Sequence, residues 1–173
     1  MAILKLRDQK NKKISDPKEI KKFLNDRGII YEQWTTDKIL DVEDDQETVL
    51  EAYQLPLSCY MARHNYTNAD VINVHPGTPN IEEVRKKFLA EHTHSEDEVR
   101  FFVDGEGEFF FNHNKEVFSI QCQKGDFISV PKGYTPWFDR APKYFVKAIR
   151  VFQSKDGWVA NYTSSGIEKK YIL

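Results

Sequence analysis

The segment from Glu91 to Glu98 contains two histidines and four carboxylates in eight positions. In an extended chain, side chains alternate between two faces, so His92, His94 and Glu98 share one face. Two imidazoles and one carboxylate on one face are the ligand set of a non-haem divalent metal, with positions left open for substrate and dioxygen. The same set also binds zinc, and a solvated acidic surface is the plain alternative. The residues therefore indicate a metal site without choosing the metal.

Helical patterns precede this segment. Asp16 and Pro17 have the form of a helix start, in which a capping carboxylate is followed by proline at the first helical position. Apolar residues follow at helical spacing, and Gly28 is a natural end for this helix. Two further helices are predicted at residues 46–54 and, after Asn80, at residues 81–89.

After residue 89 the sequence changes to short runs rich in Phe, Val and Ile, separated by turn-forming residues. We interpret these runs as strands, with one earlier strand at Val71–Val74 and a turn at residues 104–107. The later predicted strands are Glu98–Asp104, Glu108–Asn112, Glu116–Cys122, Asp126–Val130, Tyr144–Phe152 and Trp158–Tyr162. Strands at this spacing indicate a β-sandwich or barrel, with the helices placed around it.

The composition limits the class of protein. With 173 residues, of which 40% are hydrophobic, the chain has enough apolar volume for one core and little length for a second. A formal charge of -2 without a polybasic segment argues against nucleic acid or a membrane as a partner. Cys59 and Cys122 form no CxxC pair, and no apolar run suits a signal peptide or a membrane span. We expect a cytoplasmic, monomeric protein of one domain.

Two segments resemble the two motifs of the cupin superfamily. In the first, the pattern His92-x-His94-x-x-x-Glu98 is followed, after six residues, by Gly105. In the second, residues 125–133 consist of glycine, five residues and then Pro-x-Gly. The glycines and the proline stand at the intervals of the cupin motifs.

The resemblance is closer to one family within the cupins. Residues 88–103 resemble the signature of the acireductone dioxygenase family, which belongs to the methionine salvage pathway. Shorter segments resemble the same family in the same order along the chain, and they are residues 28–34, 137–139, 148–152 and 157–160. The resemblance covers nearly the whole chain.

This resemblance implies both a fold and an activity. The implied fold is mainly β, a small cupin (jelly-roll) barrel with peripheral N-terminal helices. Residues 91–163 would form the barrel core, and residues 1–90 would form a helical or mixed part that packs on it, within a single domain of residues 1–173. The implied activity is that of a metal-dependent dioxygenase that cleaves a small enediol substrate, an acireductone, with O2.

The resemblance also implies a ligand set. Members of the family bind Fe(II) or Ni(II), one per chain, at positions that correspond to His92, His94 and Glu98. The fourth ligand of the family is a histidine, and Pro136 stands at that position. Because proline has no metal-binding side chain, two alternatives are kept. One is a cupin enzyme with a three-ligand site that acts on another diketone or enediol, and the other is a non-catalytic cupin.

Further roles around the metal are implied in the same way. Arg100 and Arg150 would stabilise the negative charge of an enediolate, with a surface ion pair as the alternative for an arginine on a strand. Glu91 and Asp97 would orient the ligands or relay charge around the site. Two side chains would either line the substrate pocket or belong to the ordinary core, namely Phe88 and Phe138.

Overall fold

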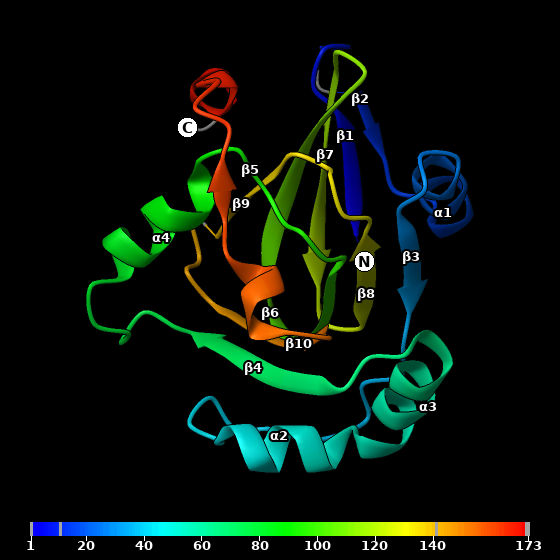
Figure 1. The fold of residues 1–173 in the computed structure, drawn as a ribbon, viewed down its shortest axis with the longest axis vertical. Helices are drawn as coiled ribbons and strands as arrows, with labels where there is room; N and C mark the ends of the chain where they lie inside the picture. Colours follow the sequence, from blue (N-terminus) through cyan, green and yellow to red (C-terminus); the bar gives the residue numbers. More distant parts are fainter. Residues whose placement is uncertain (1, 11, 141, 172–173) are drawn as a thin grey trace.

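A strongly curled β-sheet forms the centre of the structure, a computed structural model that describes residues 2–10, 12–140 and 142–171 (Figure 1). The strands of this sheet are β1 (Ile3–Leu6), β2 (Lys12–Ile14), β3 (Ile30–Gln33), β4 (Asn68–Val74), β6 (Glu98–His113), β7 (Glu116–Gln123), β8 (Asp126–Val130), β9 (Pro136–Asp139) and β10 (Val146–Phe152). Two short strands, β5 (His92–Thr93) and β11 (Asn161–Tyr162), pair with each other in a separate small sheet.

The sheet curls around β6. This strand is 16 residues long and changes partners along its length. Its first half pairs with β8 and β10, and its second half pairs with β7 and β9. Beyond these partners, β1 and β2 extend the sheet from β7, β3 extends it from β8, and β4 extends it from β10. One long strand shared by four neighbours bends the sheet into a half-barrel.

The predicted turn at residues 104–107 is wrong, because the chain continues through it as part of β6. The register between β6 and β10 shifts here, and Gly105 has a left-handed φ of +70°. Such an irregularity reverses the alternation of side chains. Phe102 consequently belongs to the interior cluster before the shift and Phe109 belongs to it after the shift.

Helices cover the outside of the sheet. They are α1 (Pro17–Asn25), α2 (Gln46–Ala52), α3 (Gln54–His64) and α4 (Ile81–Leu89), with two 3-10 turns, η1 (Lys155–Trp158) and η2 (Ile167–Lys170). α1 packs on β3, α2 on β4 and α4 on β9 (Figure 1). The predicted start of α1 is confirmed, since the Asp16 side chain accepts hydrogen bonds from the backbone N–H groups of Lys18 and Glu19. α2 and α4 confirm the other two predicted helices, whereas α3 is absent from the prediction.

The two larger buried clusters among the described residues lie on opposite faces of the sheet. The barrel interior is the cluster that contains Phe102, Phe109 and Phe138. The outer cluster contains Phe101 and Phe127, which pack against apolar residues of α2 and α3. α2 and α3 therefore cover one face of the sheet and leave the other face to the barrel interior.

The strands that the sequence pattern does not predict are short. β1, β2, β3, β5 and β9 contain between two and four residues each. A strand of this length shows no useful alternation, and it is stable only because a neighbour pairs with it. The first 90 residues thus contribute β1 to β4 to the main sheet as well as the helices.

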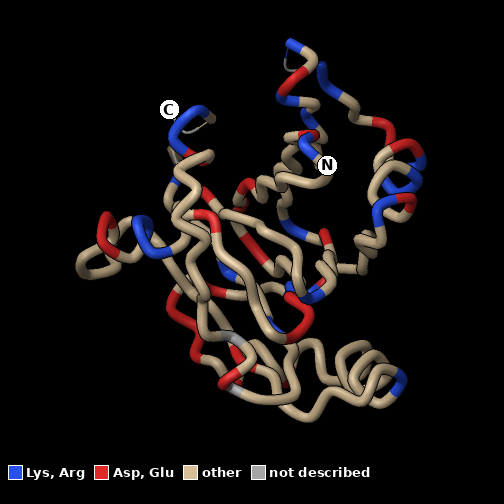
Figure 2. Tube along the Cα trace, turned by 45° about the horizontal axis from the view of Figure 1, so that its top comes forward, with Lys and Arg blue, Asp and Glu red and all other residues tan. Residues whose placement is uncertain are grey.

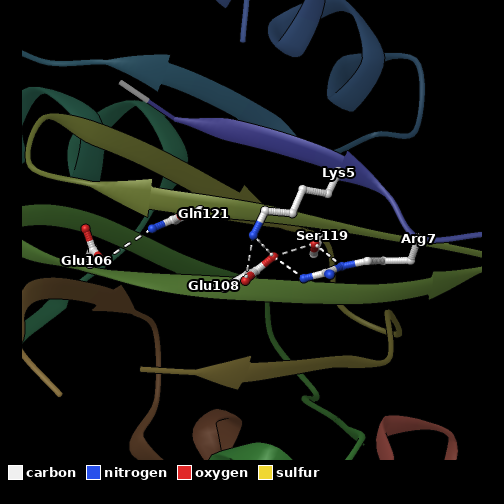
Figure 3. A network of polar contacts seen from close by, with 6 residues as sticks. All are labelled: Lys5, Arg7, Glu106, Glu108, Ser119 and Gln121. Carbon is white, nitrogen blue, oxygen red and sulfur yellow. Dashed lines mark hydrogen bonds and ion pairs between the residues drawn. The ribbon is translucent and has the colours of Figure 1, made fainter. Parts of the chain in front are cut away.

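An ion-pair network holds β1 against β7 and β6 on the outer face of the sheet (Figure 3). The Glu108 carboxylate accepts hydrogen bonds from Lys5 Nζ at 3.0 Å and from Ser119 Oγ at 2.6 Å, and it also pairs with Arg7. Arg7 Nε donates to the same Ser119 hydroxyl at 2.8 Å. One carboxylate therefore balances two cations, Lys5 of β1 and Arg7, which directly follows β1.

Replacing Glu108 by glutamine is expected to lower the free energy of unfolding by about 2 kcal/mol, because Lys5 and Arg7 then lose their counter-charge in a mostly buried place. Thermal denaturation should show a melting temperature lower by roughly 4–8 °C. Glu106→Gln is the matched control, because Glu106 pairs with the exposed Lys143. A surface pair contributes at most about 1 kcal/mol. Equal losses in the two variants would contradict the assigned role of Glu108.

Charges of both signs occur side by side on the helices, as on α1 and α4 (Figure 2). Within the described parts of the chain, no helix is long and apolar enough to cross a membrane.

Candidate active site

The predicted ligands His92 and His94 lie side by side. The shared face expected for His92, His94 and Glu98 assumed a regular extended chain, but residues 94–97 belong to no strand and separate β5 from β6. The two imidazole rings nevertheless meet edge to face, with centroids 4.9 Å apart and an interplanar angle of 84°. The break between β5 and β6 therefore does not separate the two rings.

A backbone carbonyl sets the orientation of the His92 ring. His92 Nδ1 lies 2.7 Å from the carbonyl oxygen of Ala90, and His92 is only 3% exposed. Because a carbonyl only accepts hydrogen bonds, Nδ1 carries a proton, and Nε2 is the ring nitrogen left to bind a metal. Metal-binding histidines have this arrangement. The Tyr162 ring of β11 packs against the His92 ring, with centroids 5.9 Å apart.

Glu98 lies at the start of β6, beside Arg100. Both residues are buried, and Arg100 Nη2 lies 2.6 Å from Glu98 Oε1. The second carboxylate oxygen, Glu98 Oε2, is buried and has no hydrogen-bond partner among the described residues. A buried carboxylate oxygen without a partner is costly, and a cation is the partner that suits it. Glu98 can therefore bind a cation and keep its ion pair with Arg100.

His94 lies in the electrostatic field of the same groups. Burial lowers the pKa of His94, and the charges of His92 and Arg100 act in the same direction, whereas the Glu98 carboxylate opposes them. The neutral imidazole that results is the form that binds a metal.

The side chains of His92, His94 and Glu98 carry donor atoms that suit a divalent cation. Their positions in this structure, however, do not form a coordination site. Among residues 2–10, 12–140 and 142–171, no group of three or more His, Cys, Asp or Glu side chains is close enough together to hold a metal ion. The favourable features are Nε2 of His92, the neutral ring of His94 and the orphaned Oε2 of Glu98. Such a mixed nitrogen and oxygen set suits iron, nickel or zinc.

Pro136 is the first residue of β9. It is buried and lies opposite Phe111 of β6 in the sheet register. β9 packs against β5, the strand that contains His92. The position is therefore close to the candidate ligands, and its side chain supplies no donor atom.

The two predicted pocket residues, Phe88 and Phe138, both contact Arg100. The Arg100 guanidinium carbon lies 4.8 Å from the centroid of the Phe138 ring and 5.8 Å from that of the Phe88 ring. Phe88 comes from α4 and Phe138 from β9, so the helix and the strand meet over the arginine. The structure brings these three predicted residues together.

Arg150 and Asp97 are engaged elsewhere. Arg150 of β10 stands in register with Arg100, and its guanidinium forms a bidentate ion pair with Asp70 of β4 at 2.7 and 2.5 Å. Asp97 accepts a hydrogen bond from the backbone N–H of Lys132 at 2.9 Å and another from Tyr66. Asp97 therefore holds the loop that leads to β9.

Glu91 binds residues 163 and 165 of the C-terminal segment next to β5, the strand that contains His92. Glu91 is 4% exposed, and its carboxylate accepts hydrogen bonds from Thr163 Oγ1 at 2.5 Å and Ser165 Oγ at 2.6 Å. Burial acts to raise the pKa of Glu91, but the hydrogen bonds from Ser165 and Thr163 outweigh it, so the pKa lies below its usual value. Glu91 is ionised and positions the chain beside His92.

Sequence reasoning missed Arg140, which the structure places near Arg100. It is 2% exposed, and its guanidinium carbon lies 5.3 Å from the centroid of the Phe88 ring. Its position two residues after Phe138 was the available signal, because alternate residues of a strand share a face.

Comparisons with known proteins found a family profile and several similar proteins. The profile of the ARD/ARD' family matches residues 4–160. The chain is 50% identical, over 159 residues, to the acireductone dioxygenase of Picosynechococcus sp., a match that covers 91% of this chain and 90% of that protein. It is 44% identical to the acireductone dioxygenase of Granulibacter bethesdensis, with 88% of this chain and 85% of that protein covered.

A solved structure has the same fold. The acireductone dioxygenase of Bacillus anthracis, with a cadmium ion in its active centre, superimposes with a TM-score of 0.86 and 31% sequence identity. The match covers 94% of this chain and 98% of that one. The expected mainly β fold of the cupin type, with helices outside the barrel, is confirmed.

Proposed function

The chain belongs to the ARD/ARD' family, and we propose on this basis that it is a metal-dependent dioxygenase that cleaves an acireductone with O2. The observation that carries the proposal is the 50% identity to the acireductone dioxygenase of Picosynechococcus sp. over 91% of the chain. Such an activity belongs to methionine salvage, and its substrates are a small enediol and dioxygen.

We propose that one Fe(II) or Ni(II) per chain is held by His92, His94 and Glu98. The orphaned Oε2 of Glu98 and the oriented ring of His92 support this set. With Pro136 at the fourth position, the protein would supply three ligands, which suffice for a metal that must keep positions open. When bound, the metal would supply Lewis acidity and a place where the enediol oxygens coordinate.

The residues around these ligands would bind and shield the substrate. Arg100 is buried, and its guanidinium would stabilise the negative charge of the ionised enediol in a place of low dielectric constant. Phe88 and Phe138 would cover that charge and exclude water, since both rings already pack on Arg100. Arg150, paired with Asp70, would add positive charge on the same face.

Glu91 and Asp97 would act as positioning residues. Glu91 holds residues 163 and 165 against the strand of His92, and Asp97 holds the loop before β9. We extend the proposal to one domain of residues 1–173, because β1, β3 and β4 pair with strands of the region 91–163.

The proposal is tested with the purified chain, loaded with Fe(II) or Ni(II) and mixed with a freshly generated acireductone in an oxygen electrode. We expect oxygen uptake well above the uncatalysed rate with at least one metal, and none after chelation. Uptake with another enediol or diketone alone would favour the diverged enzyme that Pro136 suggests. Absence of uptake with every enediol would favour a non-catalytic protein.

A further inference from the structure

Arg140 is a buried cation with part of its guanidinium left without a partner. It follows β9, and the alternation that places Phe138 in the barrel interior also places Arg140 there. The side chain is 2% exposed. Its Nε and Nη2 are buried, and no described residue accepts a hydrogen bond from either atom.

Nε and Nη2 form one edge of the Arg140 guanidinium. In two other arginines of this protein, the same edge donates hydrogen bonds to a carboxylate. Arg85 Nε and Nη2 donate to the two carboxylate oxygens of Asp139 at 2.8 and 2.9 Å. Arg150 uses the same two nitrogens to hold both oxygens of Asp70. This edge of an arginine matches an anion with two adjacent oxygens. Arg140 thus presents the same pair of donors, and no described residue supplies two oxygens to it.

The charges near Arg140 leave the barrel interior with a surplus of positive charge. Arg100 and Arg140 both lie against the Phe88 ring, and Glu98 is bound to Arg100. The neighbouring carboxylate, Asp139, is held by Arg85. Burial and the charge of Arg100 lower the pKa of Arg140 to about 10, so Arg140 stays protonated at neutral pH. A buried cation of this kind requires an anion.

We propose that the Nε and Nη2 edge of Arg140 binds the oxyanion of the substrate, and that Arg140 and Arg100 together hold the ionised enediol in the barrel interior. This inference rests on the proposed function. Arg140 would be a second cation, besides Arg100, that binds the substrate. Binding of an anion would also explain why the charged Arg140 is buried beside an aromatic ring. The ligand class is an anion with two adjacent oxygens.

The test compares wild type with Arg140→Met, which removes the charge at similar length, and Arg140→Lys, which keeps the charge without the fork. The probe is ascorbate, a stable ionised enediol, titrated by calorimetry into the metal-loaded chain without oxygen. Arg140→Met should bind ascorbate at least roughly thirtyfold more weakly than wild type does. The ascorbate affinity of Arg140→Lys should lie between those of wild type and Arg140→Met. Arg63→Met, at an exposed position of α3, is the control and should bind as wild type does.

Two further measurements separate ligand binding from a merely structural role. Without ligand, Arg140→Met should melt a few degrees higher than wild type, because it removes a buried charge whose Nε and Nη2 have no hydrogen-bond partner among the described residues. With acireductone, its KM should rise far more than its kcat falls. Equal ascorbate affinity in wild type and Arg140→Met, or no binding by wild type, overturns the inference. Binding through Arg140 without acireductone turnover would contradict the proposed function instead and leave the anion site standing.

Discussion

Replacing His94 by alanine is expected to strip the protein of its metal. The proposed site has three protein ligands, so this change removes one of two nitrogen donors and leaves His92 and Glu98. Loss of even an outer partner of a ligand weakens metal binding about 10- to 100-fold, and loss of a ligand itself should exceed that. Elemental analysis after gel filtration should show metal falling from about one ion per chain to a small fraction, with oxygen uptake lost in parallel.

His113→Ala is the matched control for this experiment. His113 is also a histidine near the barrel, but its ring stacks on Tyr134, with centroids 4.9 Å apart. Metal content should stay at the wild-type value, because His113 is not among the proposed ligands. Unchanged metal in His94→Ala would refute the assigned site, and loss of metal in His113→Ala would place an unexpected ligand there.

Gly105→Ala is expected to produce the largest loss of stability. A Cβ atom at this position would lie 2.3 Å from the carbonyl oxygen of Phe145 and 2.9 Å from Cα of Val146. These are backbone atoms of the adjacent chain, so no side-chain rotation relieves the clash. The left-handed φ should lower the free energy of unfolding by about 1–2 kcal/mol and the overpacking by about 1–3 kcal/mol. The total loss should be roughly 3 kcal/mol. Urea denaturation should report this loss, and the melting temperature should fall by roughly 6–12 °C.

Gly133→Ala separates the two causes. Gly133 has a similar left-handed φ of +84°, but nothing lies within 4 Å of an added Cβ atom. Only the backbone term of about 1–2 kcal/mol should therefore appear. If the two alanine variants lose the same stability, the contact between Gly105 and the chain at Phe145 is not responsible.

The elements that the sequence predicts correctly are those with local causes. α1 begins where Asp16 caps it and Pro17 starts it, and both effects act within one turn of helix. Strands β7 and β8 are confirmed because their apolar runs are flanked by turn residues, as at Gly125. In each case the deciding interactions lie within a few residues of one another.

The errors have non-local causes. Residues 104–107 contain two glycines and read as a turn, but pairing with β10 on one side and with β7 on the other keeps the chain extended through them. β9 is only four residues long, and it is a strand because β6 lies beside it. A local pattern contains no information about such partners.

The sequence by itself determined the kind of chemistry and the order of the residues that would perform it. The types and spacing of His92, His94 and Glu98 indicate a divalent metal, because donor atoms belong to side chains and their spacing belongs to the chain. Only the tertiary structure decided which charged side chains form ion pairs and which are buried. It places Arg100 on Glu98 and Arg150 on Asp70, and it buries Arg140 with Nε and Nη2 that find no hydrogen-bond partner among the described residues. The physical reason is that burial and ion pairing depend on which strands lie side by side, and those strands are far apart in the chain.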